Sequence, residues 1–177
     1  MTDKELKKRL ENLDKREIVA LVKELIAHTK ENRLYVETKL SSPSEMASLA
    51  ERYKEIIRNE FFPARGIGEA RLGVAKKAIA DFRKASGDMC ATLDLMIYYV
   101  ENGTTFTVKY GDMYERFYTS MENVFGDVVD ALTKAGDMAL VERFRPRLRK
   151  IVEDAEVTGW GYHEQLGDML DELGDGK

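Results

Sequence analysis

The sequence predicts an all-α protein built from seven to eight antiparallel helices. Apolar residues recur every three to four positions along most of the 177 residues, only three prolines interrupt the chain, and no segment shows convincing strand character. Gly-Asp-Met occurs four times, and the copies at Gly87, Gly111 and Gly136 stand 24 and 25 residues apart. Glycine commonly ends a helix and aspartate begins one. This spacing of one helix plus one turn predicts either a bundle or a short solenoid of helical hairpins.

The N-terminal part is expected to contain four helices. The first covers residues 3–11, and a capping-box pattern of Asp14 and Glu17 opens the second. A third helix is expected over 34–40, after a break near residues 30–32. Ser42, Pro43 and Glu45 start a fourth, which ends before Pro63. The apolar stripe of the second helix consists of Ile18, Leu21, Val22, Leu25 and Ile26.

The middle of the chain is expected to supply the centre of the fold. Residues 63–68 form a loop, and a helix follows over 69–85. Residues 89–101 are apolar on nearly every side, which is typical of a central helix. Asn102 and Gly103 are expected to close that helix, and 104–110 to form an irregular connection or a short strand.

Three features organise the C-terminal part. Asp112 and Glu115 form a second capping-box pattern before a strongly periodic helix. The helix after Gly136 contains Pro146, which is expected to kink it. A last helix is expected over 159–173. Because the connections are short, we expect one domain over residues 1–177.

Composition excludes several classes of protein. The formal net charge is -4, which disfavours a nucleic-acid binder driven by overall charge. No segment is apolar and long enough for a signal peptide or a membrane span, and Cys90 is the single cysteine. We therefore expect a soluble, cytoplasmic protein. Salt bridges to neighbouring helices explain the arginines of residues 143–149 more simply than a docking patch for an acidic partner.

The first candidate binding surface is the segment of residues 158–163. It contains Trp160, the only tryptophan, which lies between two glycines. Tyr162 and His163 follow the second glycine. Histidine could act as an acid, base or ligand near neutral pH, and tryptophan could form an apolar wall. The competing interpretation is that His163 is a hydrogen-bonded residue of the core.

The second candidate surface surrounds the connection after the central helix. It would combine Glu101, Tyr110, Asp112, Glu115 and Tyr118, because polar and aromatic groups beside a loop can bind a small ligand. The simpler interpretation makes Asp112 a helix cap and Tyr118 a core residue.

No catalytic residue, metal ligand set or cofactor motif is identified. The chain has only two histidines and lacks Gly-x-Ser-x-Gly and a phosphate-binding loop. The leading hypothesis is a binding or adaptor module for an unidentified protein partner. The alternative is a small-molecule or enzymatic site that combines Glu101, Asp112, Trp160 and His163.

Several stretches resemble a bacterial family of small all-helical proteins of unknown function. They are residues 53–63 (YKEIIRNEFFP), 75–82 (AKKAIADF), 98–101 (YYVE), 106–107 (FT), 110–112 (YGD), 117–118 (FY), 120–121 (SM) and 159–163 (GWGYH). The resemblance covers about residues 4–170. It implies a family and no activity.

Overall fold

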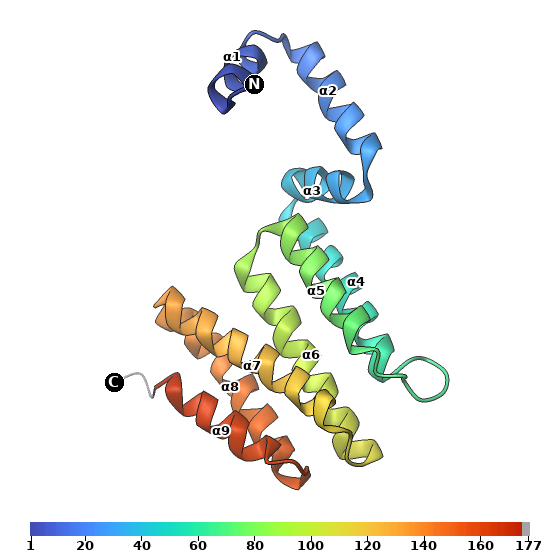
Figure 1. Ribbon diagram of the computed structural model, residues 1–177, viewed down its shortest axis with the longest axis vertical. Coiled ribbons are helices and arrows are strands. Elements are labelled where there is room, and N and C mark those ends of the chain that lie inside the picture. The colour runs from blue at the N-terminus through green and yellow to red at the C-terminus, as the bar shows by residue number, and fades with distance from the viewer. Residues whose placement is uncertain (175–177) are drawn as a thin grey trace.

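The computed structural model describes residues 1–174, and this part of the chain is all-α, as predicted (Figure 1). It contains nine α-helices and one short 3-10 helix, and no strand. The helix bounds are α1 Asp3–Glu11, α2 Lys15–His28, α3 Lys30–Leu40, α4 Pro43–Phe61, α5 Leu72–Ser86, α6 Met89–Tyr110, α7 Glu115–Ala135, α8 Met138–Asp154, η1 Ala155–Val157 and α9 Tyr162–Glu172.

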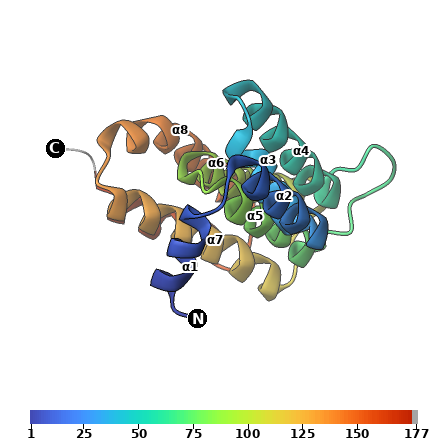
Figure 2. The same cartoon turned by 90° about the horizontal axis from the view of Figure 1, so that it is seen from above.

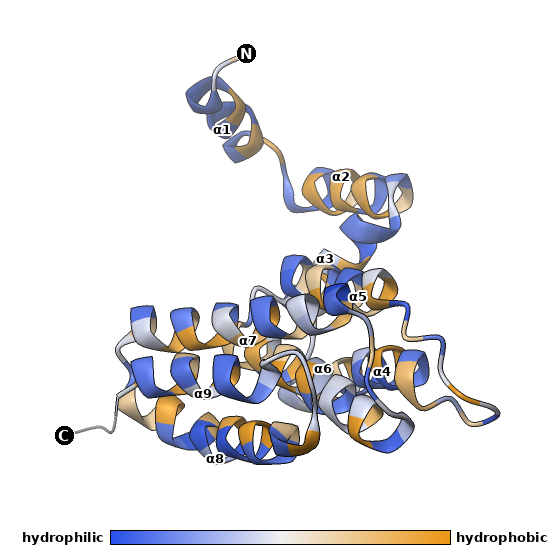
Figure 3. Cartoon of the chain, turned by 60° about the horizontal axis from the view of Figure 1, so that its bottom comes forward, coloured by the Kyte–Doolittle hydropathy of each residue, from blue (hydrophilic) through white to orange (hydrophobic). Residues whose placement is uncertain are grey.

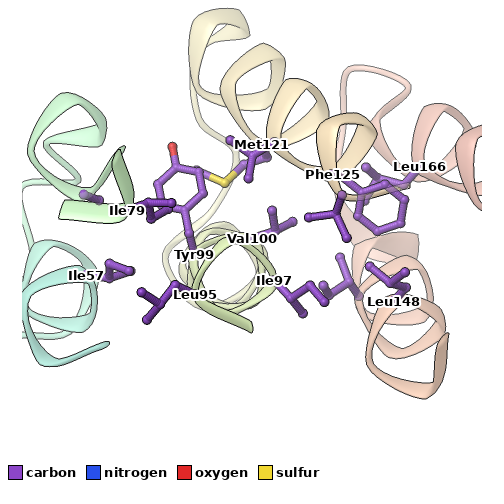
Figure 4. Close-up of a cluster of buried hydrophobic side chains, with 14 of the residues drawn as sticks. Ile57, Ile79, Leu95, Ile97, Tyr99, Val100, Met121, Phe125, Leu148 and Leu166 are labelled. Atoms are coloured by element: carbon purple, nitrogen blue, oxygen red, sulfur yellow. The ribbon is translucent and has the colours of Figure 1, made fainter. Parts of the chain in front are cut away.

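Helices α4 to α9 form a bundle about α6, and we call this part the body. Helix α6 packs against α4, α5, α7 and α8, and α9 covers α7 and α8. Figure 4 shows α6 end-on, with side chains from the surrounding helices directed toward it. Leu95, Ile97, Tyr99 and Val100 of α6 are fully buried. The apolar segment is therefore central, as its composition predicted.

The predicted end of the central helix at Asn102 and Gly103 is wrong, because α6 continues to Tyr110. The side-chain Nδ2 of Asn102 donates to the backbone carbonyl of Tyr98, one turn earlier in α6, at 2.7 Å. A Cβ atom on Gly103 would lie 2.3 Å from the sulfur of Met121 in α7. Gly103 therefore allows two helices to approach closely instead of ending one, and residues 104–110 are neither irregular nor extended.

The Gly-Asp-Met copies separate helices at three of their four positions. Gly87 and Gly136 end α5 and α7 in the left-handed conformation. Asp88 and Asp137 accept hydrogen bonds from the first amides of α6 and α8. The copy at Gly111 ends α6, but its aspartate caps nothing, and the copy at 167–169 lies inside α9. Helix α8 continues on both sides of Pro146.

Helices α1 and α2 project from one end of the body, and we call them the N-terminal arm (Figures 1 and 3). Neither helix contains a buried residue. Leu6, Leu10, Ile18, Leu21 and Leu25 are between 37% and 46% exposed. The predicted amphipathic pattern is present, and Val22 and Ile26 of α2 are half-buried beside α3, but the other residues of the apolar face stay exposed. Seen from above in Figure 2, α1 also lies apart from α3 and α4.

No helix among the described residues combines the length and the apolar character that crossing a bilayer would need.

Candidate functional site

Asp112 joins two connections that lie far apart in the sequence. Its Oδ1 accepts hydrogen bonds from the Tyr118 hydroxyl at 2.7 Å and from the Gly159 amide at 2.9 Å. The α6–α7 connection is thereby tied to the connection before α9. The predicted capping box of Asp112 and Glu115 is wrong, since Tyr114 precedes the first turn of α7 and makes no side-chain cap.

The contact between Asp112 and Gly159 requires a glycine. A Cβ atom at position 159 would lie 2.7 Å from Asp112 Oδ2, which is closer than real Cβ contacts. The hydrogen bond from Tyr118, and then that from the Gly159 amide, hold the pKa of Asp112 below its usual value. Asp112 is therefore ionised at neutral pH and accepts both hydrogen bonds as a carboxylate.

The hydroxyl groups of Tyr118 and Tyr162 form hydrogen bonds with threonines inside the bundle. Tyr118 is 2.6 Å from the Thr107 hydroxyl, and the Tyr162 hydroxyl is 2.9 Å from that of Thr104. The rings of Tyr118 and Tyr162 pack with centroids 5.0 Å apart. Burial raises the pKa of both hydroxyls. Both tyrosines therefore stay protonated at neutral pH and lie in the core, so neither offers a surface to a ligand.

Trp160 lies on the surface in an unfavourable backbone conformation. Its side chain is 62% exposed and its φ is +62°. Such left-handed φ values cost a bulky residue roughly 1–3 kcal/mol and persist only where the surroundings impose them. The Gly159 amide bound to Asp112 immediately precedes it, and Val157, at 75% exposure, lies three residues before. We call Val157 and Trp160 the Trp160 surface.

His163 faces the bundle beside this surface. It is half-buried at the start of α9, and its Nδ1 lies 2.9 Å from the carbonyl oxygen of Val152 in α8. The ring thereby joins α9 to α8. This arrangement agrees with the interpretation of a hydrogen-bonded core histidine.

Glu101 belongs to a separate ion cluster on another side of α6. Arg147 donates to its two carboxylate oxygens at 2.7 and 2.8 Å and also to Asp94. Lys54 of α4 lies 2.9 Å from Asp94. Although burial opposes it, hydrogen bonds from Lys54 and Arg147 keep the pKa of Asp94 below its usual value. Ion pairs therefore link helices α4, α6 and α8.

The remaining candidate, Tyr110, packs in an aromatic group at the end of α6. Its ring centroid is 4.9 Å from that of Phe106 and 6.3 Å from that of Phe62. Lys109 lies over both the Phe62 and Tyr110 rings. Tyr110 is exposed, but its ring is engaged by its own neighbours.

The structure therefore brings together only part of the predicted sites. Asp112, Tyr118 and Tyr162 form one network that leads to Trp160, whereas Glu101 lies about 14 Å from the end of α6 along its axis. Sequence reasoning missed Thr104 and Thr107. No local signal marks the threonines, but the paired glycines around Trp160 did mark that connection.

Within residues 1–174, no three His, Cys, Asp or Glu side chains are placed to hold a metal ion.

The fold and this surface define an all-helical protein with a central buried helix, an exposed tryptophan and a projecting N-terminal arm. Residues 1–174 match the model of a family of unknown function, DUF6155, and the chain belongs to that family. No curated protein and no solved structure matches the chain.

Proposed function

We propose that this protein is a cytoplasmic binding module whose Trp160 surface docks a segment of another protein. The observation that carries the proposal is Trp160 itself, an aromatic side chain that is 62% exposed on a backbone with φ +62°. Folding gains nothing from exposing this ring. The connection that carries this conformation is held by Asp112, which accepts a hydrogen bond from the Gly159 amide at 2.9 Å. Tryptophans are enriched among residues that dominate binding energies.

The surroundings of the Trp160 surface indicate the chemistry of its partner. Glu156, Glu164 and Asp112 are exposed acidic residues at or beside the α8–α9 connection. An apolar and aromatic centre with an acidic rim suits a segment that carries lysine or arginine next to an apolar anchor. Arginine and lysine can also stack on the indole face.

The single tryptophan makes this proposal directly testable. Trp160 is the only tryptophan, so the intrinsic emission of the full chain reports on this surface alone. We expect peptides that combine basic and apolar residues to shift the emission to shorter wavelength with saturation, because docking removes water from the ring. Acidic peptides of equal length and apolar content should leave it unchanged.

Two variants control this titration. Val157→Asp should abolish the shift, since it places a charge in the apolar centre but keeps the fluorophore. Tyr35→Ala removes another exposed aromatic side chain, 51% exposed in α3, and should bind as the wild type does. Equal responses to basic and acidic peptides, or an unaffected Val157→Asp variant, would refute the proposal.

The alternative of a small-molecule or enzymatic site needs Glu101, Asp112, Trp160 and His163 to reach one ligand. Glu101 is engaged by Arg147, and His163 faces Val152. This geometry favours the docking proposal, because catalytic groups must share the reach of one substrate.

A further inference from the structure

A groove lies at the end of the body from which the arm projects. Its floor is apolar and consists of Met89, Leu93 and Met96 of α6 with Ala131 of α7, and its volume is about 390 Å³. Asp88, Asp127 and Asp130 line it together with Arg83 and Lys134. We call it the α6–α7 groove. Grooves of this kind receive the apolar face of an amphipathic helix.

Helix α1 has the complementary pattern. Leu6 and Leu10 lie one turn apart on the same side, and both are exposed. At about 100° per residue, Lys7 and Arg9 border this stripe on its two sides, whereas Lys4 and Lys8 lie opposite. Two apolar anchors bordered by Lys7 and Arg9, with Asp3 also on this side, therefore face an apolar floor whose rim carries three aspartates beside Arg83 and Lys134.

The arm of the same molecule is held away from this groove. Helix α2 packs on α3, with Val22 and Ile26 half-buried. The corner is fixed by Asn32, whose amide Nδ2 donates to the Leu25 carbonyl at 2.9 Å, and whose backbone N–H donates to Thr29 at 3.0 Å. Since α2 has 14 residues, it carries the C-terminal end of α1 about 21 Å away from that corner (Figure 1). In this arrangement no residue of α1 lines the groove of its own molecule.

We propose that α1 of one molecule binds the α6–α7 groove of a second copy, and that the exchange is reciprocal. Each molecule has one exposed arm and one open groove. In a reciprocal exchange between two copies, each arm occupies the groove of the other copy, so both arms and both grooves are covered. The two contacts reinforce each other, because formation of the first makes the second intramolecular. This interaction uses neither Val157 nor Trp160, so it stands independently of the proposed function.

The test is the molar mass of the full chain by sedimentation equilibrium across the micromolar range. We expect wild type to approach twice 20.2 kDa as concentration rises. Leu6→Glu with Leu10→Glu should remain monomeric, and so should Met89→Glu with Ala131→Glu. Lys4→Gln with Lys8→Gln changes the net charge by the same amount on the opposite face of α1 and should dimerise as wild type does.

Mixing the two deficient variants decides how the copies pair. In a reciprocal exchange, the arm-deficient chain still offers a groove and the groove-deficient chain still offers an arm. Their mixture should therefore form a heterodimer, weaker than the wild-type dimer by roughly 10²- to 10⁴-fold because one contact remains. This recovery would also show that each variant is folded.

Three results would overturn the proposal. Wild type could stay monomeric throughout, which would leave the arm for a different partner or for its own groove. The groove variant could dimerise normally while the arm variant does not, which would indicate arm-to-arm pairing. The mixture could also fail to associate even at concentrations about 10⁴-fold above the wild-type dissociation constant, although both variants are folded by circular dichroism.

Discussion

The arm and the body use the same kind of helix with opposite results. Helix α2 of the arm and α7 of the body both have an apolar stripe at helical spacing. In α7 that stripe is buried against α6 and α9, whereas in α2 most of it faces solvent. The difference teaches that amphipathic spacing specifies an apolar helix face. Whether that face is buried depends on which other helices of the chain pack against it.

The largest expected contrast is in the cost of truncating an apolar side chain. Phe61 is fully buried and packs edge-on against Tyr99 at 5.7 Å, so Phe61→Ala should lower the free energy of unfolding by about 3–5 kcal/mol. Leu21→Ala in the arm should cost less than about 1 kcal/mol, because Leu21 stays exposed. Urea unfolding of dilute protein measures both. Similar losses would mean that the arm is part of the core.

A second contrast concerns two helical glycines. Gly103→Ala should cost about 1–3 kcal/mol, since the added methyl group meets the flexible Met121 side chain. Gly73→Ala in α5 meets nothing within 4 Å and should be neutral or stabilising by up to about 1 kcal/mol. Unfolding of the two variants side by side separates close packing from helix propensity. A neutral Gly103→Ala would contradict the tight approach of α6 and α7.

The ion cluster should contribute less than the apolar core. Arg147→Met leaves Glu101 without a cation and Asp94 with Lys54 alone, and we expect a loss of about 1–2 kcal/mol at neutral pH. The exposed pair of Arg33 and Glu37 provides the control, and Arg33→Met should cost less than about 0.5 kcal/mol. Equal costs would show that partial burial adds nothing to the cluster.

The same cluster makes a prediction about pH. Because the folded-state pKa of Asp94 is lowered, its contribution is present above the unfolded value of about 3.9 and is lost as pH falls through the folded value. Wild type should therefore lose stability in that acidic window. The Arg147→Met variant should lose less stability over this pH range. Denaturation at several pH values measures the free energy of unfolding against pH, and equal slopes for wild type and variant would contradict a role of the cluster.

The smallest effect is expected at the α8–α9 connection, which is exposed like the arm but held by hydrogen bonds like the body. Emission of Trp160 should be constant at neutral pH and change as pH falls through the lowered pKa of Asp112. Asp112→Asn should remove that step, since an amide does not titrate there. A step that persists in Asp112→Asn would assign it to another group.

Most of the fold could be predicted because helical periodicity and caps are local signals. Asp14, Ser42, Asp88 and Asp137 begin helices as their sequence patterns indicate. Gly103 misled the prediction because a glycine that ends a helix and one that admits a neighbouring side chain look alike in sequence. Which of the two applies depends on Met121, eighteen residues away.

The candidate site could be predicted only in part for the same reason. Asp112 followed by Glu115 fits a capping box, but its true partners are Tyr118 and Gly159, and the latter contact depends on how α9 returns to the bundle. Trp160 stood out in the sequence because it is the only tryptophan and has a glycine on each side. Its left-handed backbone could not be foreseen, since glycine rather than tryptophan usually occupies that conformation.

The most direct test of the contrast between arm and body is hydrogen exchange of the full chain at several protein concentrations. We predict that amides of α1 exchange rapidly in dilute solution and become protected as concentration rises, whereas amides of α6 are protected throughout. The Leu6→Glu, Leu10→Glu variant should show no such gain. Strong protection of α1 at every dilution, or none at any concentration, would contradict the account of an arm that is completed by a second copy.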